Sequence, residues 1–343
     1  MKRKRLRSLP RPKVGKIVSD LLSGGRNKVR GKMTDVLLAL IPALGVATYF
    51  FGPRVLILAI MSMAASAFFE ALYCNIVRRR QTWRDGSAMV TGLLLAMTLP
   101  ASAPYWMVLL GDAFAILVVK NLYGGLGKNF LNPALAGRVF LFSFPVLMSR
   151  WTAAMQWPGL GSTADAVTSA TPMAAMRAGA LPTVTIRELL VGQRGGALGE
   201  TAALMLLAGG LYLLLRKDIR LRIPASFLGT VAVLSLIWNK GNDPVQWMLY
   251  SLLTGGLLLG ALFMATDPVT SPVTPGGQWL YGVGCGVMTV FLRNCGAWRE
   301  GVGFAILFMN LCVWLLDKAA RPGKGKGEIR LMDDGGEGAR LDE

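Results

Sequence analysis

The sequence contains no histidine among its 343 residues. This absence excludes His-ligated haem, His-containing zinc sites and a histidine general base within the chain. Cysteine is scarce as well: Cys74, Cys285, Cys295 and Cys312 form no Cys-x-x-Cys pair, so iron–sulfur ligation by this chain alone is not expected. We interpret the four as small buried hydrophobic residues and predict no metal site. If the chain carries out redox chemistry, an organic cofactor is the expected carrier.

Charged residues are also few, and acidic ones are outnumbered by basic ones. Only 16% of the residues are charged and 53% are hydrophobic, yet the net charge is +18. A soluble protein of this size needs more polar surface, so the composition indicates an integral membrane protein. The basic residues stand between apolar segments, which favours a role in membrane topology over nucleic-acid binding.

The apolar segments predict an all-α polytopic membrane protein with about ten transmembrane helices. The expected spans are 34–52, 55–77, 87–103, 104–120, 130–148, 197–215, 223–239, 245–265, 277–293 and 301–317. The third and fourth are crowded around Pro100 and Pro104, so their boundaries are the least defined.

The distribution of lysine and arginine predicts the orientation of these spans. Of the 37 basic residues, 28 fall in segments on the side of the N-terminus, eight fall on the opposite side, and Arg138 lies within a span. Such a bias is typical of a multi-pass protein of the cytoplasmic (inner) membrane with both termini in the cytoplasm. The predicted organisation is a basic arm (1–33), a first membrane half (34–148), an extracytoplasmic loop (149–196), a second membrane half (197–317) and a cytoplasmic tail (318–343).

A faint internal repeat relates the two halves. TGLLLAMTLP (91–100) is similar to TGGLLLGALFMATDP (254–268), and the two lie five spans apart. Equivalent spans would then run in opposite directions, which predicts two inverted five-helix halves. GGLGKNFLNPALAGR (124–138) and ATDPVTSPVTPGG (265–277) look like breaks in the helices. Irregular backbone at membrane depth is tolerated where it lines a cavity or is buried in protein, although ordinary Pro/Gly loops are an alternative.

Glycine-rich stretches do not indicate a nucleotide site. GGLGKN (124–129) is not a phosphate-binding loop, because Asn129 stands where Ser or Thr is required. GVGCG (282–286), Gly256 and Gly260 lie in apolar spans, where close helix packing is the expected role.

Three ionisable residues fall within or near spans: Asp112, Arg138 and Glu70. Such residues are costly in lipid and are therefore candidates for a function. Mutual pairing, or contact with partner subunits, explains them equally well.

The stretch DAVTSATPMA (165–174) is small and polar, although the chain on both sides is strongly apolar. The proline after Thr171 favours an extended conformation at Thr171, which would present its hydroxyl away from the chain. Ser169 and Ala170 leave room for a bulky group beside it, and Asp165 would either hold a metal ion for an external modifying enzyme or cap a turn. From the residues alone, an ordinary polar loop explains this stretch as well.

This stretch also resembles a known motif. Asp165 to Thr171 resembles the flavinylation pattern D-x-x-[ST]-x-A-T, in which FMN is joined through its phosphate to the final threonine. The rest of the chain resembles the RnfD family, a membrane component of the Rnf electron-transport complex. This resemblance rests on DGSAMVTGLLLAMTLP, VVKNLYGGLGKNFLNPALAGRVFLFSFP, FMATDPVTSPVTPGGQ and REGVGFAILFMNLCVWLLD, in this order between residues 85 and 317. One departure is Ser169, where the family often has Gly.

The resemblance implies a membrane subunit of a ferredoxin:NAD oxidoreductase that translocates Na⁺ or H⁺. It implies FMN bound covalently to Thr171, with Asp165, Thr168, Ser169 and Ala170 in supporting positions. Arg177, six residues on, is a candidate neighbour of the phosphate charge. No catalytic residue is expected in this chain, which would relay electrons through the flavin and be inactive alone. A second, non-covalent flavin such as riboflavin is left open.

The implied partners are iron–sulfur, nucleotide-binding and second flavin-bearing subunits, together with a flavin transferase for maturation. One alternative is the related B subunit of the sodium-pumping NADH:quinone reductase, which has a longer N-terminal region. An alternative from another class is a secondary transporter with inverted repeats. The broken helices together with Asp112 and Arg138 fit such a transporter, whereas the threonine loop does not.

Overall fold

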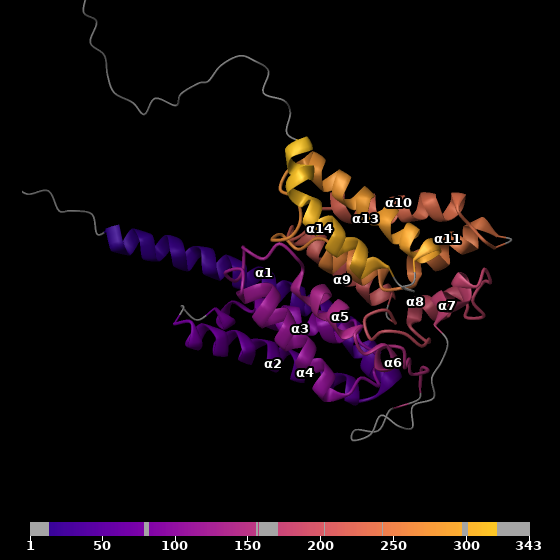
Figure 1. Cartoon of the computed structure of the whole chain (residues 1–343), viewed down its shortest axis with the longest axis horizontal. Helices are drawn as coiled ribbons and strands as arrows, with labels where there is room; N and C mark the ends of the chain where they lie inside the picture. Colours follow the sequence, from indigo (N-terminus) through magenta and orange to yellow (C-terminus); the bar gives the residue numbers. More distant parts are fainter. Residues whose placement is uncertain are drawn as a thin grey trace, which may run out of the picture.

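The computed structural model describes residues 14–78, 82–155, 157, 171–201, 203–241, 243–296 and 301–320. Within these ranges every regular element is a helix and no β-strand is present, which confirms the all-α prediction (Figure 1).

The first membrane half contains the helices up to residue 148. They are α1 (Val14–Phe51), α2 (Arg54–Ile76), the 3-10 helix η1 (Trp83–Asp85), α3 (Ser87–Met97), α4 (Tyr105–Ala113), the π-helix η2 (Phe114–Asn121), α5 (Pro133–Leu141) and α6 (Pro145–Met148). Two short helices follow, α7 (Pro172–Arg177) and α8 (Ile186–Val191).

The second half contains the remaining helices. They are α9 (Ala203–Leu215), α10 (Arg222–Ile237), α11 (Pro244–Leu253), α12 (Leu257–Leu259), the π-helix η3 (Gly260–Met264), α13 (Pro275–Cys295) and α14 (Val302–Ala319).

Several of these helices can cross a membrane. In the described residues, Val29–Phe51, Arg54–Ile76 and Val302–Ala319 are long and apolar enough to do so singly. A fourth span results if Pro244–Leu253 and Leu257–Met264, which are bent by 60° at their junction, are counted together. The chain is therefore a multi-pass helical membrane protein. Each remaining expected span contains a shorter helix.

The third expected span, 87–103, is helical only as far as Met97. Pro100 and Pro104 follow, and a proline both lacks an N–H group and disfavours helix at the residue before it. The chain therefore turns at 98–104 before α4 begins.

The helices pack as two neighbouring bundles, seen in Figure 1 in purple and magenta for the first half and in orange and yellow for the second. In the first half α2 packs against α3 and α4, and in the second α10 packs against α11 and α13. Between the halves, α1 lies along α9, and α5 contacts α14.

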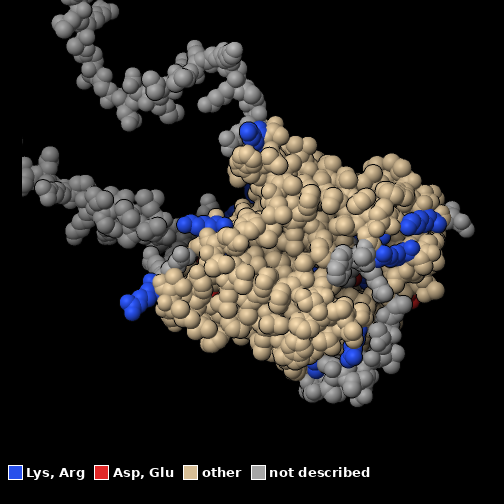
Figure 2. All heavy atoms as spheres, viewed as in Figure 1, with Lys and Arg blue, Asp and Glu red and all other residues tan. Residues whose placement is uncertain are grey.

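The apolar core extends across both halves. Leu40 of α1, Leu95 of α3, Phe227 of α10 and Phe263 of η3 belong to one buried cluster. Large apolar side chains also cover the outside, among them Ile60, Phe68, Leu211, Ile237 and Trp314. In Figure 2 the visible Lys and Arg side chains lie at the periphery of the face, and its broad middle has none. This surface suits a hydrocarbon surrounding.

Both predicted breaks are irregular and largely buried rather than ordinary surface loops. Asn132 ends the first break: its Oδ1 accepts from Ala134 N (3.1 Å) and Leu135 N (3.3 Å), which starts α5. Its Nδ2 donates to the carbonyl of Met264 at 3.2 Å, so one break is joined to the end of η3 in the other half. In the second break Thr270 is 2% exposed.

Close packing explains most of the span glycines. A Cβ added to Gly286 would lie 2.6 Å from Thr230 Cβ, and one added to Gly260 would lie 2.5 Å from Val302 Cγ1. Gly256 differs from the prediction. It and Gly255 have φ of +65° and +68°, a conformation that glycine tolerates, and they produce the bend before α12.

Candidate functional site

Thr171 is the residue at which α7 begins. Its backbone is extended, with φ −73° and ψ 148°, as the following proline predicts. Its hydroxyl makes no capping hydrogen bond to the helix. By contrast, Thr185 and Thr274 cap their helices by accepting from Glu188 N (3.3 Å) and Gly277 N (3.1 Å). The Thr171 hydroxyl is therefore not used to start its own helix.

Thr171 is also only 8% exposed, so a group attached to it would lie against neighbouring side chains. The other predicted motif residues, Asp165, Thr168, Ser169 and Ala170, lie outside the described residues. Arg177 is the last residue of α7, and at 1.5 Å per residue it lies roughly 9 Å along the axis from Thr171. Its Nη2 donates to the carbonyl of Gly296 at 2.6 Å, which anchors the guanidinium to the end of α13.

A cavity of about 360 Å³ lies beside α7. Its walls combine two tryptophans, two methionines and two arginines: Trp238, Trp247, Met173, Met176, Arg177 and Arg293. The Arg293 guanidinium donates to the carbonyls of Ser251 (2.7 Å) and Thr254 (2.8 Å), so it is held in place by α11. Aromatic walls suit a planar ring, and guanidinium groups suit a phosphate.

α7 and α8 lie at the right end of the molecule in Figure 1, whereas α1 begins at the left end and α14 ends at the upper left. Thr171 and its neighbours are thus remote from both described chain ends.

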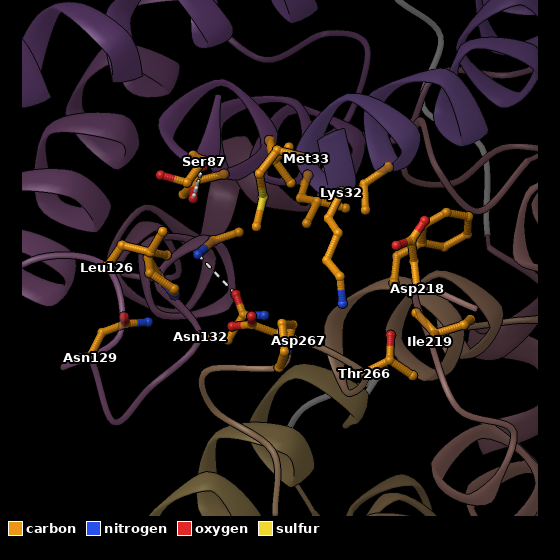
Figure 3. A pocket seen from close by; sticks show the side chains of 18 of the residues that line it. Lys32, Met33, Ser87, Leu126, Asn129, Asn132, Asp218, Ile219, Thr266 and Asp267 are labelled. Atoms are coloured by element: carbon orange, nitrogen blue, oxygen red, sulfur yellow. Dashed lines mark hydrogen bonds between the residues drawn. The ribbon is translucent and has the colours of Figure 1, made fainter. Parts of the chain in front are cut away.

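A second, larger cavity of about 810 Å³ lies between the two halves. Its lining comes from α1, α3, η2, the two breaks and the α9–α10 turn, and includes Lys32, Met33, Ser87, Lys120, Asn129, Asn132, Asp218, Phe263, Thr266 and Asp267. In Figure 3 the Lys32 side chain reaches between Asp267 and Asp218. Burial raises the pKa of the Asp267 carboxyl, although hydrogen bonds from Val269 N (3.2 Å) and the Thr270 hydroxyl (3.1 Å) oppose the rise. The cavity offers apolar walls together with donors and acceptors.

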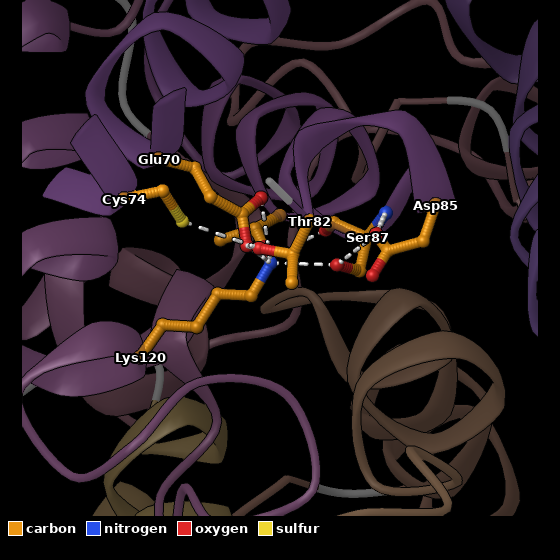
Figure 4. A network of polar contacts seen from close by, with 7 residues as sticks. Glu70, Cys74, Thr82, Asp85, Ser87 and Lys120 are labelled. Carbon is orange, nitrogen blue, oxygen red and sulfur yellow. Dashed lines mark hydrogen bonds and ion pairs between the residues drawn. The ribbon is translucent and has the colours of Figure 1, made fainter. Parts of the chain in front are cut away.

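Next to this cavity a buried ion pair joins α2 to η2 (Figure 4). Lys120 Nζ lies 3.1 Å from Glu70 Oε1 and 3.2 Å from Oε2, and the two side chains are 2% and 0% exposed. Lys120 also donates to Ser87 Oγ at 2.6 Å, and Thr82 donates to Glu70 Oε1 at 2.7 Å. Both charges are thus hydrogen-bonded and mutually compensated, the condition for burying an ion pair.

This pair was not predicted. Mutual pairing among the three ionisable span residues would have joined Glu70 to Arg138, but its partner is Lys120, at the end of the fourth span. The available signal was a lysine that directly follows the apolar run AILVV in that span.

Asp112 and Arg138 do not pair with each other. Asp112 is fully buried in α4, and its Oδ1 accepts from the hydroxyls of Ser62 and Ser66, each at 2.9 Å. The Arg138 guanidinium lies 5.8 Å from the centre of the Phe142 ring. It also lines a cavity of about 300 Å³ near the Gly255 bend.

A polytopic helical membrane protein is thus defined, with one threonine-centred site at one end and a polar cavity between its halves. The chain belongs to the NQR2, RnfD, RnfE family, whose model matches residues 23–326. This membership confirms the resemblance seen in the sequence.

Three relatives illustrate the match, and each is named as the D component of an ion-translocating oxidoreductase complex. The chain is 42% identical to that of the Na⁺-translocating ferredoxin:NAD⁺ oxidoreductase complex of Acetobacterium woodii, over 83% of this chain and 87% of that protein. It is 38% identical to that of the proton-translocating ferredoxin:NAD⁺ oxidoreductase complex of Clostridium ljungdahlii, over 85% and 90%. It is 37% identical to that of the ion-translocating oxidoreductase complex of Stutzerimonas stutzeri, over 87% and 92%.

Proposed function

We propose that this chain is the RnfD-type membrane component of an ion-translocating ferredoxin:NAD⁺ oxidoreductase, a redox-driven translocase of Na⁺ or H⁺, and that it relays electrons through FMN bound covalently to Thr171. The observation that carries the proposal is the match, over more than four-fifths of the chain, to relatives named as this component. The coupling ion differs between the named relatives, so both ions stay within the proposal.

The residues at Thr171 fit a flavin phosphate. The hydroxyl is free of a capping role, the backbone is extended, and the residue is enclosed by neighbours. FMN would supply reversible electron transfer there. The chain's own contribution is to hold the phosphate by an ester to Thr171, with Asp165, Thr168, Ser169 and Ala170 as the surrounding motif. Arg177 contributes a positive charge at the far end of α7, and the nearby tryptophans keep water from the site.

A second, non-covalent flavin such as riboflavin fits the cavity between the halves. The size of the cavity is within the usual range for small-molecule sites, roughly 300–1,000 Å³. Lys120, Asn129 and Thr266 provide polar groups against apolar walls, which is the mixture that a ring system with an uncharged polar chain requires.

Electron transfer to and from these flavins would need partner subunits. The sequence has no histidine and no Cys-x-x-Cys pair, so iron–sulfur centres and the nucleotide site belong to other chains of the complex. A second flavin-bearing subunit completes the proposed relay, and a flavin transferase attaches FMN to Thr171. The isolated chain is expected to oxidise neither NADH nor ferredoxin.

We also propose ten spans in two inverted halves, in the inner membrane, with both termini cytoplasmic and 149–196 outside. The contacts of α1 with α9 and of α5 with α14 support the repeat, because each pair joins helices of equivalent position in the two halves. Further support comes from the repeated sequences. α3 ends at Met97 shortly before Pro100, and η3 ends at Met264 shortly before Pro268.

The flavin assignment is tested on the complex produced together with a flavin transferase. Thr171→Ala should abolish the fluorescence of this chain on a denaturing gel without loss of membrane insertion, whereas the matched control Thr168→Ala should retain it. Mass spectrometry should find the Thr171 peptide heavier by FMN minus water. After acid precipitation, flavin in the supernatant reports the non-covalent site. Flavin mapped to Thr168, or an unmodified Thr171 in fluorescent protein, would contradict the assignment.

The same gel separates the alternatives. A secondary transporter is favoured by the 60° bend between α11 and η3 and by the buried Asp112, but it predicts no covalent flavin. A B-type subunit of a sodium-pumping NADH:quinone reductase predicts a flavin on threonine together with quinone-dependent turnover of the complex.

A further inference from the structure

The carboxyl group of Asp112 lies in a closed polar cluster inside the first half. The residue is 0% exposed on α4, and it faces two fully buried serines of α2, Ser62 and Ser66. Ser62 also contacts the carbonyl of Gly92 on α3. Asp112 Oδ2 has no hydrogen-bond partner in the described part of the chain.

The number of protons in this cluster determines the state of the carboxyl. Ser62 Oγ lies 2.7 Å from Gly92 O and 2.9 Å from Asp112 Oδ1, and Ser66 Oγ lies 2.9 Å from the same Oδ1. Each hydrogen bond needs one proton, and each serine hydroxyl has only one. Two hydroxyl protons cannot fill three contacts. A protonated carboxyl supplies the third when Oδ1 donates to Ser62, Ser62 donates to Gly92 O, and Ser66 donates to Oδ1.

The electrostatic surroundings lead to the same state. A carboxylate removed from water costs several kcal/mol unless a cation compensates it. Glu70 has Lys120 as its cation, but Asp112 has no ion-pair partner among the described residues. A buried group in that position takes up a proton instead of remaining charged.

The charged groups on the helices around Asp112 are all held elsewhere. On α2 these are Glu70, paired with Lys120 of η2, and Arg54, which donates to the carbonyls of Ala101 and Ala103. On α5 the charged group is Arg138, which lies over the Phe142 ring. The α3 segment Ser87–Met97 contains no charged residue.

The polar residues around Asp112 extend in one direction only. On α2, Ser62, Ser66, Glu70 and Cys74 follow each other at intervals of four residues and are all buried, so they form one polar stripe. Four residues before Ser62 stands the buried Leu58, and four before Asp112 stands Val108. The stripe therefore leads from Asp112 toward the Glu70–Lys120 pair and the cavity between the halves.

We propose that Asp112, with Ser62 and Ser66, is a proton-binding site inside the first membrane half, and that it exchanges its proton along the α2 stripe with the end of the molecule where Glu70 and Lys120 lie. The ligand is a proton and not a metal ion, because the oxygen atoms lie at hydrogen-bonding distance from one another. The site does not depend on the proposed flavins.

Infrared difference spectroscopy of the whole complex in lipid vesicles tests the protonation. At neutral pH, a carbonyl stretch of a protonated carboxylic acid should be present and should disappear in Asp112→Asn. The matched control Asp243→Asn removes an acid that caps α11 near the surface, and asparagine caps equally well, so this variant should keep the band. A hydrophobic carbodiimide should modify Asp112 at neutral pH, as read by peptide mass.

Deuterium exchange of the same band tests the route. Ser66→Ala should slow exchange by roughly 100-fold, the size of effect that one positioned proton-transfer group has. Ser226→Ala, a buried serine of α10 in the other half, should leave the rate unchanged. Lack of a band lost in Asp112→Asn, or a band that Na⁺ removes, overturns the proton site. An unchanged exchange rate in Ser66→Ala overturns the route.

Discussion

The buried Glu70–Lys120 pair allows a stability experiment whose magnitude follows from the structure. Lys120→Met keeps the length of the side chain but removes its ammonium group. Glu70 would then keep one hydrogen bond, from the Thr82 hydroxyl at 2.7 Å, while it remains fully buried. Loss of one partner from a buried ion pair destabilises proteins by about 3–5 kcal/mol, because the remaining charge is uncompensated.

A double-mutant cycle separates this effect from simple loss of packing. Glu70→Gln should destabilise by a similar amount, since it leaves the ammonium of Lys120 without its carboxylate. The double variant Glu70→Gln with Lys120→Met buries no charge and should recover most of the loss, because replacement of both partners is often close to neutral. The expected coupling free energy is therefore about 3 kcal/mol, larger than the roughly 0.5 kcal/mol within which independent sites add.

The assay is unfolding of the purified protein by SDS in mixed micelles, followed by fluorescence of its nine tryptophans. Lys240→Met, at an exposed lysine, is the control and should stay within about 0.5 kcal/mol of the parent. Additive single variants, or a loss below about 1 kcal/mol in Lys120→Met, would refute the view that the pair is mutually compensated in a low-dielectric interior.

Two further predictions concern orientation and pH. Cysteine placed at Ser162 should react with an impermeant reagent on intact cells, whereas cysteine at Ser8 should not; the reverse pattern would reject the proposed topology. Burial and the adjacent Asp35 carboxylate raise the pKa of Asp218, in the turn after α9. The folded protein therefore holds this proton more tightly than the unfolded chain, so the stability that Asp218 contributes is present below the ordinary carboxyl pKa and is lost as pH rises through the raised value. Asp218→Asn should thus raise the unfolding midpoint at neutral pH but not at acidic pH, and an equal gain at both would contradict the assignment.

Local signals were sufficient for much of the fold. The sequence Asn132-Pro133 combines a good N-cap with a proline suited to the first helical turn, and α5 begins there. The proline after Thr171 likewise specified its extended backbone. The bend at Gly255 and Gly256 was not predicted, because two glycines in an apolar run also suit close packing.

Contacts between distant residues could not be predicted in the same way. Glu70 and Lys120 are 50 residues apart, and so are Ser62 and Asp112. No periodicity within one helix shows which face of another helix it will meet, so these partners appear only when α2, α4 and η2 are packed together. The sequence indicated that Glu70 and Asp112 needed an explanation, but it could not distinguish an ion pair from a neutral carboxyl.

The topology prediction tolerates these errors because it depends on a sum and not on any single residue. Lys120 belongs to the inner segments in that sum, and Arg54 and Arg293 belong to the outer ones, yet the structure buries all three. Removing them takes one basic residue from the inner count and two from the outer, so the bias toward the N-terminal side does not weaken. The role of a residue, unlike the orientation of the chain, depends on its own contacts. Lys120 therefore contributes correctly to the topology, although its function as the partner of Glu70 is visible only in the folded chain.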